Sequence, residues 1–530
     1  MSFGRYGGGG GGGYGGGGGG GYGGGGGGYG GGGGGYGGGG GGGFGGGGGR
    51  GGRWDDSKAG SRLRKPDWSR ERLEPFQKDF LKLNPAAAGR NPAEVEDFKR
   101  RNEVNIEGRE APQPIMNFDE VGFHDSLVRA LNSQFQKPTV IQSVSWPIAM
   151  SGRDMIGIAQ TGSGKTLSFM MPAMHHITAQ HSIRSGDGPI ALILCPTREL
   201  AIQVQEVGEQ FGRMVGMRST CCYGGAPKRQ QAQDLERGVE IVVATPGRLL
   251  DFLEAGTTNM KRCTFLILDE ADRMLDMGFE PQIRKIVEQI RPDRQVCMFS
   301  ATWPREVQQL AKDFFNQDEV FINIGSMDLT ANHNIQQIVE VMQDNHKERR
   351  LLQLLEELMK VHNPKTLIFV ETKRKADDLT RGMRRDGWPA FCIHGDKAQG
   401  EREWVLTEFR SGKTPILIAT DVAARGLDVD DIKYVVNYDY PQCPEDYIHR
   451  IGRTGRIDKK GVAYTFFTYA NGKYAKDLIK VLEEAGQQIP PDLYQMQSMS
   501  RSAPPRGRWA DRKRSSNGFG PDDFAKRGRF

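Results

Sequence analysis

Residues 264-TFLILDEADRML-275 place three carboxylates directly after a short apolar run. The run 265-FLIL-268 has no polar position, which predicts a strand buried on both faces of a parallel sheet. Asp269, Glu270 and Asp272 then follow within four residues, and a helical pattern begins. Carboxylates that lie close together repel one another and are unfavourable to bury. They must therefore face solvent or surround a cation.

Apolar runs of this kind alternate with longer amphipathic stretches through the middle of the chain. The continuous runs predict strands of parallel sheets, and the stretches between them predict crossover helices. A polar stretch, 323-NIGSMDLTANHN-334, interrupts the alternation. We therefore expect an α/β fold with two domains, at 118–325 and 335–487, joined by a linker at 326–334. The predicted strands are 155–158, 191–195, 240–244, 265–268, 296–299, 366–370, 390–393, 415–419, 434–438 and 462–467.

The two ends of the chain differ from the middle in composition. Residues 1–53 hold 41 of the 76 glycines, with single aromatic residues between runs of six or seven glycines, and residues 488–530 are rich in Pro, Ser, Arg and Gly. Such segments bury too little surface to offset their backbone entropy, so we expect two disordered tails. Residues 54–117 form a charged extension. Residues 1–53 carry a net charge of +3, residues 501–530 carry +6, and the rest of the chain carries about −3. These basic tails predict either a polyanionic partner such as nucleic acid or a solubilising role.

The cysteine pattern and the hydropathy of the chain indicate its redox compartment and whether it spans a membrane. The seven cysteines show no CxxC or Cys/His spacing that suits a metal, and their scatter favours a reducing compartment. The N-terminus is glycine-rich rather than an apolar signal segment. No apolar stretch approaches the roughly 20 residues that span a bilayer. We therefore expect no membrane partner.

A glycine-rich loop, 159-AQTGSGKT-166, follows the predicted strand 155–158. Its glycines let backbone N–H groups wrap around phosphate oxygens, and the helix that follows adds its N-terminal dipole. Lys165 can reach the outer phosphates, and the Thr166 hydroxyl can ligate Mg²⁺. Ala159 stands where the usual pattern begins with glycine. The loop predicts a nucleotide-binding site.

This loop offers a reason for the crowded carboxylates. A nucleotide-binding parallel sheet places an acidic motif at the end of a neighbouring strand. Asp269 would hold Mg²⁺, largely through water, and Glu270 would orient or deprotonate the attacking water. Asp272 would be neutralised by hydrogen bonds or a basic partner. Without the loop, the same residues could equally be a solvated helix start whose charges complement the dipole.

Eleven motifs in order resemble those of the DEAD-box RNA helicases, over about residues 118–485. They are 135-FQKPTVIQ-142, 159-AQTGSGKT-166, 196-PTREL-200, Gly224-Gly225, 245-TPGR-248, 269-DEAD-272, 300-SAT-302, 367-LIFVET-372, 399-QGER-402, 419-ATDVAARGLD-428 and 449-HRIGRTGR-456. The chain looks most like the nuclear RNA-processing branch of animal and fungal members. Gln134 is a departure, since many members have glycine there. The resemblance implies two tandem RecA-like domains, with ATP and Mg²⁺ as cofactors.

The resemblance also implies residues for ATP binding and hydrolysis. An aromatic ring can stack on adenine while a glutamine amide matches its edge and mismatches guanine. Phe118 is a further aromatic that could instead be ordinary core. Arg453 and Arg456 would be arginine fingers from the second domain, because a planar guanidinium suits phosphate oxygens. The implied catalytic residues are Lys165, Asp269, Glu270, Arg453 and Arg456. The implied ATP-binding residues are Phe118, Phe135, Gln136, Lys137, Gln142, Ala159, Gln160, Thr161, Gly162, Ser163, Gly164, Lys165, Thr166 and Asp428.

By the same resemblance, both domains line an RNA groove that contacts the backbone, so sequence specificity should be weak. The implied RNA-binding residues are Pro196, Thr197, Arg198, Gly225, Thr245, Pro246, Gly247, Arg248, Thr372, Gln399, Arg402 and Thr420. Asp272, Ser300, Thr302 and His449 would couple the ATP and RNA sites.

The resemblance implies an RNA-stimulated ATPase that unwinds short duplexes locally and remodels ribonucleoproteins. We expect it in the nucleus, with possible shuttling to the cytoplasm, among RNA-processing partners. An ATP-gated RNA clamp that acts through its partners is an alternative. A DNA helicase or nucleotide switch fits the folds but not the full motif set.

Overall fold

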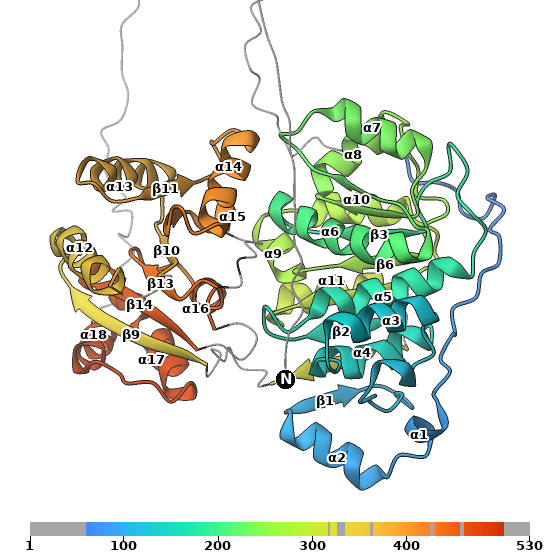
Figure 1. Cartoon of the computed structure of the whole chain (residues 1–530), viewed down its shortest axis with the longest axis horizontal. Helices are drawn as coiled ribbons and strands as arrows, with labels where there is room; N and C mark the ends of the chain where they lie inside the picture. Colours follow the sequence, from blue (N-terminus) through green and yellow to red (C-terminus); the bar gives the residue numbers. More distant parts are fainter. Residues whose placement is uncertain are drawn as a thin grey trace, which may run out of the picture. The chain divides into compact units, whose positions relative to one another are not determined.

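The computed structural model describes residues 60–315, 318–325, 334–360, 364–424, 429, 431–455 and 460–502. The glycine-rich tail, most of the predicted linker and residues 503–530 lie outside these ranges. Within them, no helix combines the length and apolar character that a membrane span requires. The ordered chain forms two α/β domains, each with its own sheet (Figure 1).

The first sheet has eight strands in the order β1-β8-β2-β7-β6-β3-β5-β4. Seven strands run parallel, and β1 pairs antiparallel with β8 at one edge. Strands β2, β3, β5, β6 and β7 are buried at every position, as the continuous apolar runs predict, whereas the inner strand β8 is partly exposed at two positions. The strands are β1 (Val104–Glu107), β2 (Met155–Ile158), β3 (Ala191–Leu194), β4 (Ser219–Cys222), β5 (Ile241–Ala244), β6 (Phe265–Leu268), β7 (Gln295–Ser300) and β8 (Val320–Ile324).

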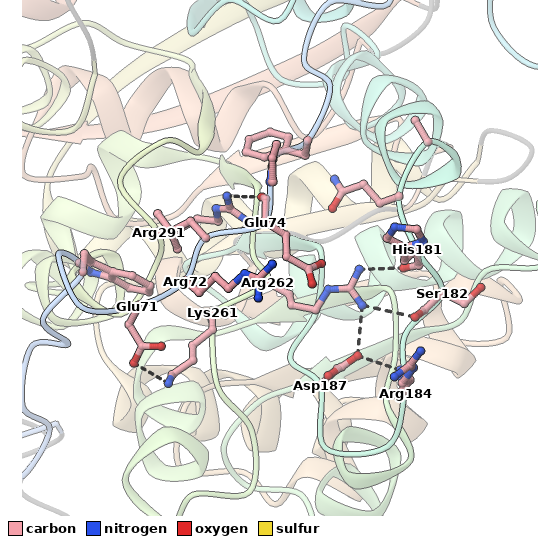
Figure 2. A pocket seen from close by; sticks show the side chains of 16 residues that line it. Glu71, Arg72, Glu74, His181, Ser182, Arg184, Asp187, Lys261, Arg262 and Arg291 are labelled. Atoms are coloured by element: carbon pink, nitrogen blue, oxygen red, sulfur yellow. Dashed lines mark hydrogen bonds and ion pairs between the residues drawn. The ribbon is translucent and has the colours of Figure 1, made fainter.

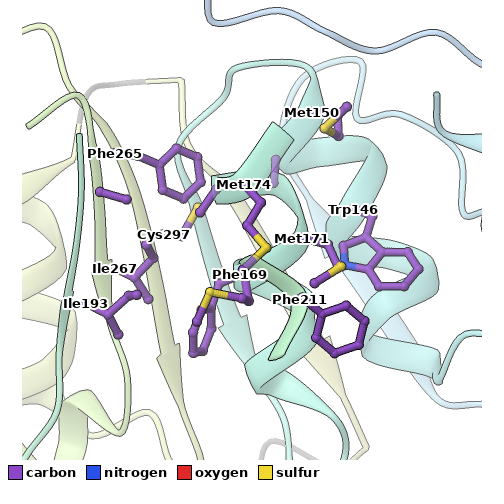
Figure 3. Packing of buried hydrophobic residues seen from close by; sticks show 14 of the residues in the cluster. Trp146, Met150, Phe169, Met171, Met174, Ile193, Phe211, Phe265, Ile267 and Cys297 are labelled. Carbon is purple, nitrogen blue, oxygen red and sulfur yellow. The ribbon is translucent and has the colours of Figure 1, made fainter. Parts of the chain in front are cut away.

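Helices cover both faces of this sheet, because successive strand residues point to opposite sides. Ile193 belongs to one buried cluster, together with Trp146, Phe169 and Phe211 from the helices of that face. Leu194 belongs to the other cluster. Figure 3 shows Phe169, Met171 and Met174 packed between the sheet and the helix that carries Trp146. The helices are α1 (Pro85–Ala88), α2 (Pro92–Arg101), η2 (Phe118–Glu120), α3 (Asp125–Gln134), α4 (Val140–Met150), α5 (Lys165–Thr178), α6 (Arg198–Val215), α7 (Lys228–Arg237), α8 (Pro246–Glu254), α9 (Ala271–Asp276), α10 (Glu280–Glu288) and α11 (Arg305–Phe314).

The charged extension packs onto the first domain. Its strand β1 lengthens the sheet, with α2 beside it (Figure 1). The backbone N–H of Phe80 donates to the carbonyl of Met150 at 2.7 Å, and the Phe80 ring meets His175 and His176 edge-on. Phe80 and Ile115 both belong to the buried cluster around Trp146. The predicted boundary at residue 118 therefore divides segments that share one core.

The extension also closes a pocket of about 390 Å³ against the first domain. Figure 2 shows its charged lining, in which most charges are already paired. Lys261 lies 2.7 Å from Glu71, Arg262 lies 3.1 Å from Asp187, and Arg291 donates to a backbone carbonyl of the extension. Lys261 and Arg262 precede β6, so this pocket lies at the amino edge of the sheet. The glycine-rich loop and the acidic motif follow their strands, at the opposite edge.

The second sheet has six parallel strands in the order β11-β12-β10-β13-β14-β9. Two further buried clusters cover its faces. Its strands are β9 (Ile335–Met342), β10 (Thr366–Phe369), β11 (Ala390–Ile393), β12 (Ile416–Ala419), β13 (Tyr434–Asn437) and β14 (Gly461–Thr468). Its helices are η3 (Asp344–His346), α12 (Lys347–Leu358), α13 (Lys373–Arg385), α14 (Gln399–Arg410), α15 (Asp421–Ala424), α16 (Pro444–Ile451), η4 (Tyr469–Tyr474), α17 (Ala475–Glu484) and α18 (Pro491–Ser502).

Helix α18 lies beyond the predicted end of the second domain at residue 487. Leu493 and Met496 are buried in the core of that domain, next to α17. These two residues are three apart and share one helix face, and their apolar contacts hold the segment in place. Part of the segment predicted as a disordered tail, from 488 onward, is therefore folded.

Candidate nucleotide and RNA site

The predicted nucleotide motifs meet at the carboxyl edge of the first sheet. The glycine-rich loop follows β2, the acidic motif follows β6, and Ser300 ends β7. Strand β7 lies between β2 and β6 in the sheet, so the three motifs are neighbours. Such an edge is where open parallel sheets bind their ligands.

The glycine-rich loop closes tightly before α5. Gly164 has φ 94°, and a Cβ at this position would lie 2.7 Å from the Gln142 amide nitrogen and 2.8 Å from the Thr139 hydroxyl. Only glycine fits this left-handed position without strain. Lys165 is buried, and its ammonium donates to the carbonyls of Ala159 at 2.6 Å and Gln160 at 3.0 Å. The ammonium thus caps the loop and would exchange these carbonyls for phosphate oxygens.

The predicted adenine contacts differ in exposure. The Gln142 amide donates to the carbonyl of Gly164 at 3.1 Å and accepts from the N–H of Thr139 at 3.0 Å. Gln142 therefore also fixes the loop to the start of α4. The ring of Phe135 is 43% exposed, whereas Phe118 is 2% exposed and packs near Trp146. Phe118 thus contributes to the core, and its contact with adenine remains a prediction.

Three buried carboxylates lie beside this loop. Asp269, Glu270 and Asp272 all have buried side chains. Burial and the charge of Glu270 raise the pKa of Asp269 to about 7. Burial lowers the pKa of Lys165, although the carboxylates oppose this shift. Within the described chain, Oε2 of Glu270 has no hydrogen-bond partner. The centre holds more negative charge than Lys165 alone can balance.

The backbone at Glu270 is strained. Its φ of 53° and ψ of 53° place a non-glycine residue in the left-handed region at the start of α9. Such a conformation costs on the order of 1 kcal/mol and persists where the surrounding structure imposes it. Here it turns the chain sharply between β6 and α9.

The Asp272 carboxylate accepts hydrogen bonds, one of the two arrangements that the sequence predicts for it. Thr302 donates to Oδ2 from its hydroxyl at 2.7 Å and from its backbone N–H at 3.1 Å. The backbone N–H of Asp272 donates to the Ser300 hydroxyl at 3.4 Å. A ring nitrogen of His449, from the second domain, lies 3.6 Å from Asp272 Oδ2. The four predicted coupling residues are therefore in contact, and their coupling role remains a prediction.

Most of the predicted RNA residues lie at helix N-termini, where backbone N–H groups attract anions. Thr197 caps α6 and Thr372 caps α13, each through its side chain. Gly225 has φ 86°, and a Cβ there would approach Arg198 to 2.4 Å. In the first domain, Pro196 and Arg198 lie at the start of α6, and the start of α8 holds Thr245, Pro246, Gly247 and Arg248. In the second domain, Thr420 precedes α15, and the first turns of α14 hold Gln399 and Arg402.

Two arginine side chains that were predicted to bind RNA already pair with protein groups. Arg248 donates to Gln231 at 3.0 Å and to the carbonyl of Ala226 at 3.2 Å. Arg402 lies 2.5 Å from Glu199, although the two come from different domains. RNA phosphates would compete with these partners.

Of the two predicted arginine fingers, the structure describes Arg453 but not Arg456. Arg453 is buried and donates to the carbonyl of His449 at 3.3 Å. Arg456 and the predicted ATP-binding residue Asp428 lie outside the described residues.

Two ion pairs of the site were not predicted. Glu199 with Arg402 and Arg273 with Asp446, at 2.5 Å each, join residues of the two domains. Glu199 stands inside the predicted motif 196-PTREL-200, and Arg273 follows the acidic motif directly. The motif positions of Glu199 and Arg402 marked them as candidate functional residues, but a motif does not give a residue's partner, which depends on the fold.

The fold and the motifs at the first sheet's edge are those of a two-domain nucleotide-binding protein, and comparison with known proteins gives its family. A family model described as DEAD/DEAH box helicase matches residues 139–310, and one described as helicase conserved C-terminal domain matches residues 346–458. The chain belongs to the DEAD-box ATP-dependent RNA helicases, which confirms the predicted family, the RecA-like fold and the enzyme class.

Individual relatives agree with this assignment. The probable ATP-dependent RNA helicase DDX17 of Mus musculus is 60% identical over 439 residues, which cover 82% of this chain and 67% of that protein. The chain covers only 60% of the length of DDX17 from Homo sapiens. The ATP-dependent RNA helicase dbp2 of Neosartorya fischeri is 58% identical over 441 residues, covering 83% of this chain and 81% of that one. S. cerevisiae Dbp5, solved bound to RNA and ADP BeF3, is 29% identical with a TM-score of 0.61, covering 73% of this chain and 98% of that one.

Proposed function

We propose that this helicase opens short RNA duplexes locally and remodels ribonucleoproteins, driven by ATP hydrolysis that RNA stimulates. The observation that carries the proposal is the buried acidic centre beside the glycine-rich loop. Three buried carboxylates lie there with Lys165 and Arg273 as buried cations, and Oε2 of Glu270 is without a partner among the described residues. Such a centre suits a nucleotide with its metal better than it suits the free protein.

The donor set fits Mg²⁺. Oxygen ligands from carboxylates, a hydroxyl and water are what this hard cation prefers. Asp269 and Thr166 would hold it, largely through water. When bound, the metal would neutralise charge on the phosphates. Glu270 would then accept the proton of the attacking water through its unpartnered oxygen.

The second domain would complete the reaction. Arg453, with Arg456, would place a guanidinium on the phosphates when the domains close. ATP and RNA would both favour that closed state, so each should tighten binding of the other. The hydrogen bonds that join Asp272 to Thr302 and Ser300 support a link between the acidic centre and the RNA-facing residues.

RNA binding would rest on backbone contacts at helix N-termini. These contacts give weak sequence specificity, so the choice of RNA would come from partner proteins and from the tails. The RNA-processing character of the resemblance supports a nuclear role among ribonucleoprotein partners.

The substitution Glu270→Gln tests the mechanism, because it keeps the shape of the side chain and removes its basic oxygen. ATP and RNA binding should persist, while ATP turnover at saturating RNA should fall by at least ~10²-fold. Glu306→Gln, an exposed residue of α11, is the matched control. Near-normal turnover in Glu270→Gln would remove Glu270 from the mechanism.

Unwinding distinguishes a helicase from a clamp. Multiple turnovers on a short RNA duplex would support the helicase. Stable, ATP-dependent RNA retention without strand separation would favour the clamp.

A further inference from the structure

Three potential metal ligands gather at the edge of the second sheet, away from the residues assigned to ATP. Asp377 lies on α13, Cys392 lies on β11, and His394 directly follows β11. One ligand atom from each lies within 4.8 Å of the other two. Within the described ranges, this is the one group of three or more His, Cys, Asp or Glu residues that is arranged in this way.

The fold brings these residues together. Cys392 and His394 are two positions apart at the end of an edge strand, so their side chains leave the same face. Helix α13 packs on this strand and brings Asp377, 15 residues away from Cys392, to the same point. The spacing along the sequence shows no metal pattern, because the third ligand comes from a separate helix.

The distances suit shared coordination. The Cys392 sulfur lies 3.5 Å from Oδ1 of Asp377, and Nε2 of His394 lies 3.1 Å from the same oxygen. Around tetrahedral Zn²⁺, with ligand bonds of roughly 2.0–2.3 Å, neighbouring ligand atoms stand roughly 3.3–3.7 Å apart. Small side-chain adjustments would therefore admit an ion.

The bonding of His394 is incomplete. Its side chain is 5% exposed, and neither ring nitrogen makes a hydrogen bond of normal geometry with any described residue. A buried polar group without such bonds is destabilising. An ion pair with Asp377 compensates only weakly for the missing hydrogen bonds of His394, because the Lys397 ammonium already lies 3.5 Å from the same carboxylate oxygen.

We propose that Asp377, Cys392 and His394 form a binding site for a divalent transition metal, with Zn²⁺ as the best match. Sulfur, imidazole nitrogen and carboxylate oxygen together are ligands of zinc, whereas magnesium and calcium take oxygen ligands. The site is thus chemically distinct from the proposed magnesium site. Three protein ligands leave a fourth position for water. Lys397 competes with the metal for Asp377.

Cobalt titration of the full chain tests the site, because Co²⁺ replaces Zn²⁺ and a thiolate ligand gives it an ultraviolet charge-transfer band. In the presence of a phosphine reductant, the band should saturate at about one equivalent per chain and disappear when Zn²⁺ is added. The band should be absent in Cys392→Ser. The control, Cys443→Ser, removes a partly buried thiol outside the cluster and should keep the band.

Further variants separate a built site from incidental binding. Asp377→Asn and His394→Gln should weaken Co²⁺ binding at least ~10-fold, as loss of a ligand does. Lys397→Gln should tighten it by about threefold or more, because a competing positive charge is removed. Zn²⁺ should raise the melting temperature of the wild-type chain but not of Cys392→Ser. A band that persists in Cys392→Ser, or no band in the wild type at saturating Co²⁺, would overturn the proposal.

Discussion

The carboxyl edges of the two sheets are built alike but carry different side chains. In the first domain, the segments after β2 and β6 present a glycine-rich loop with Lys165 and the acidic centre. In the second domain, the segments after β10, β11 and β12 present Thr372, Gln399 and Thr420 beside helix N-termini. Both edges suit phosphate groups, but among the described residues the three buried carboxylates beside a buried lysine belong to the first edge. The shared scaffold sets where ligands bind, and the side chains set which ligand.

Arg453→Ala is the strongest test of whether the second domain contributes a residue to the site at the first domain's edge. If the second domain supplies a finger to the nucleotide at the first domain's edge, turnover at saturating RNA should fall by roughly 10³-fold or more. ATP affinity in the absence of RNA should change little. Steady-state ATPase and nucleotide binding would measure the two effects, with the exposed Arg381→Ala as control. A drop of less than about threefold would mean that each edge works alone.

Gly164→Ala tests the special geometry of the first edge. The new Cβ would meet the Gln142 amide in a backbone conformation that alanine rarely adopts, so ATP affinity should fall by about tenfold. Gly186→Ala is a matched control, since Gly186 has φ 88° with nothing within 4 Å of its missing Cβ. Both variants should lose stability from backbone strain, but only Gly164→Ala should lose ATP binding. Equal ATP affinity in the two would show that the crowding at Gly164 does not matter.

The opposite edge of the first sheet should respond to pH. Burial lowers the pKa of His176 to about 3 from its ordinary 6.5, because the ring is packed near Thr264 and away from water. The unfolded chain therefore binds more protons below pH 6.5, and stability should fall by about 1 kcal/mol per pH unit as the pH drops further. Hydrogen exchange of β6 amides, corrected for intrinsic rates, would measure this slope. His176→Gln should flatten it, and an unchanged slope would assign the acid sensitivity to other groups.

The smallest effect on turnover is expected from removal of the tails. Removing residues 1–53 and 501–530 takes away the whole basic excess of the chain. RNA affinity should weaken mainly at low salt, and its salt dependence should flatten because fewer counterions are released. ATPase at saturating RNA should change little. RNA binding by both forms across a salt series would decide, and identical slopes would reduce the tails to spacers.

The predicted strands show what sequence alone can reveal. All ten predicted runs are strands. Nine of them are inner strands, where both faces are buried and the sequence is mostly apolar, as in 191-ALILC-195, and the tenth, β11, lies at an edge but is also apolar, 390-AFCI-393. The strands β1, β4 and β9 escaped prediction. They lie at sheet edges, where alternate residues are partly exposed, so their sequences lack a continuous apolar run. The inner strand β8, with the polar Asn323 next to its last residue, was also missed.

The candidate site shows the same limit. Contacts within one motif or between adjacent strands were predictable, such as Asp272 with Thr302. The pairing of Glu199 with Arg402, and the meeting of Asp377 with His394, depend on how distant segments fold together. A single sequence gives the chemical type of such residues but not their partners.

The antiparallel strand β1 has a mechanical consequence. Strand β8 is the last part of the first domain before the linker, and it is held by β2 on one side and by β1 on the other. The N–H of Gly325 also donates to the carbonyl of Glu103, just before β1, at 3.0 Å. The last residues of the first domain are therefore held by backbone hydrogen bonds as far as Gly325. Pulling on the chain at Gly325 would therefore load the hydrogen bonds to β1 as well as those to β2, so the extension adds mechanical resistance at the end of the first domain.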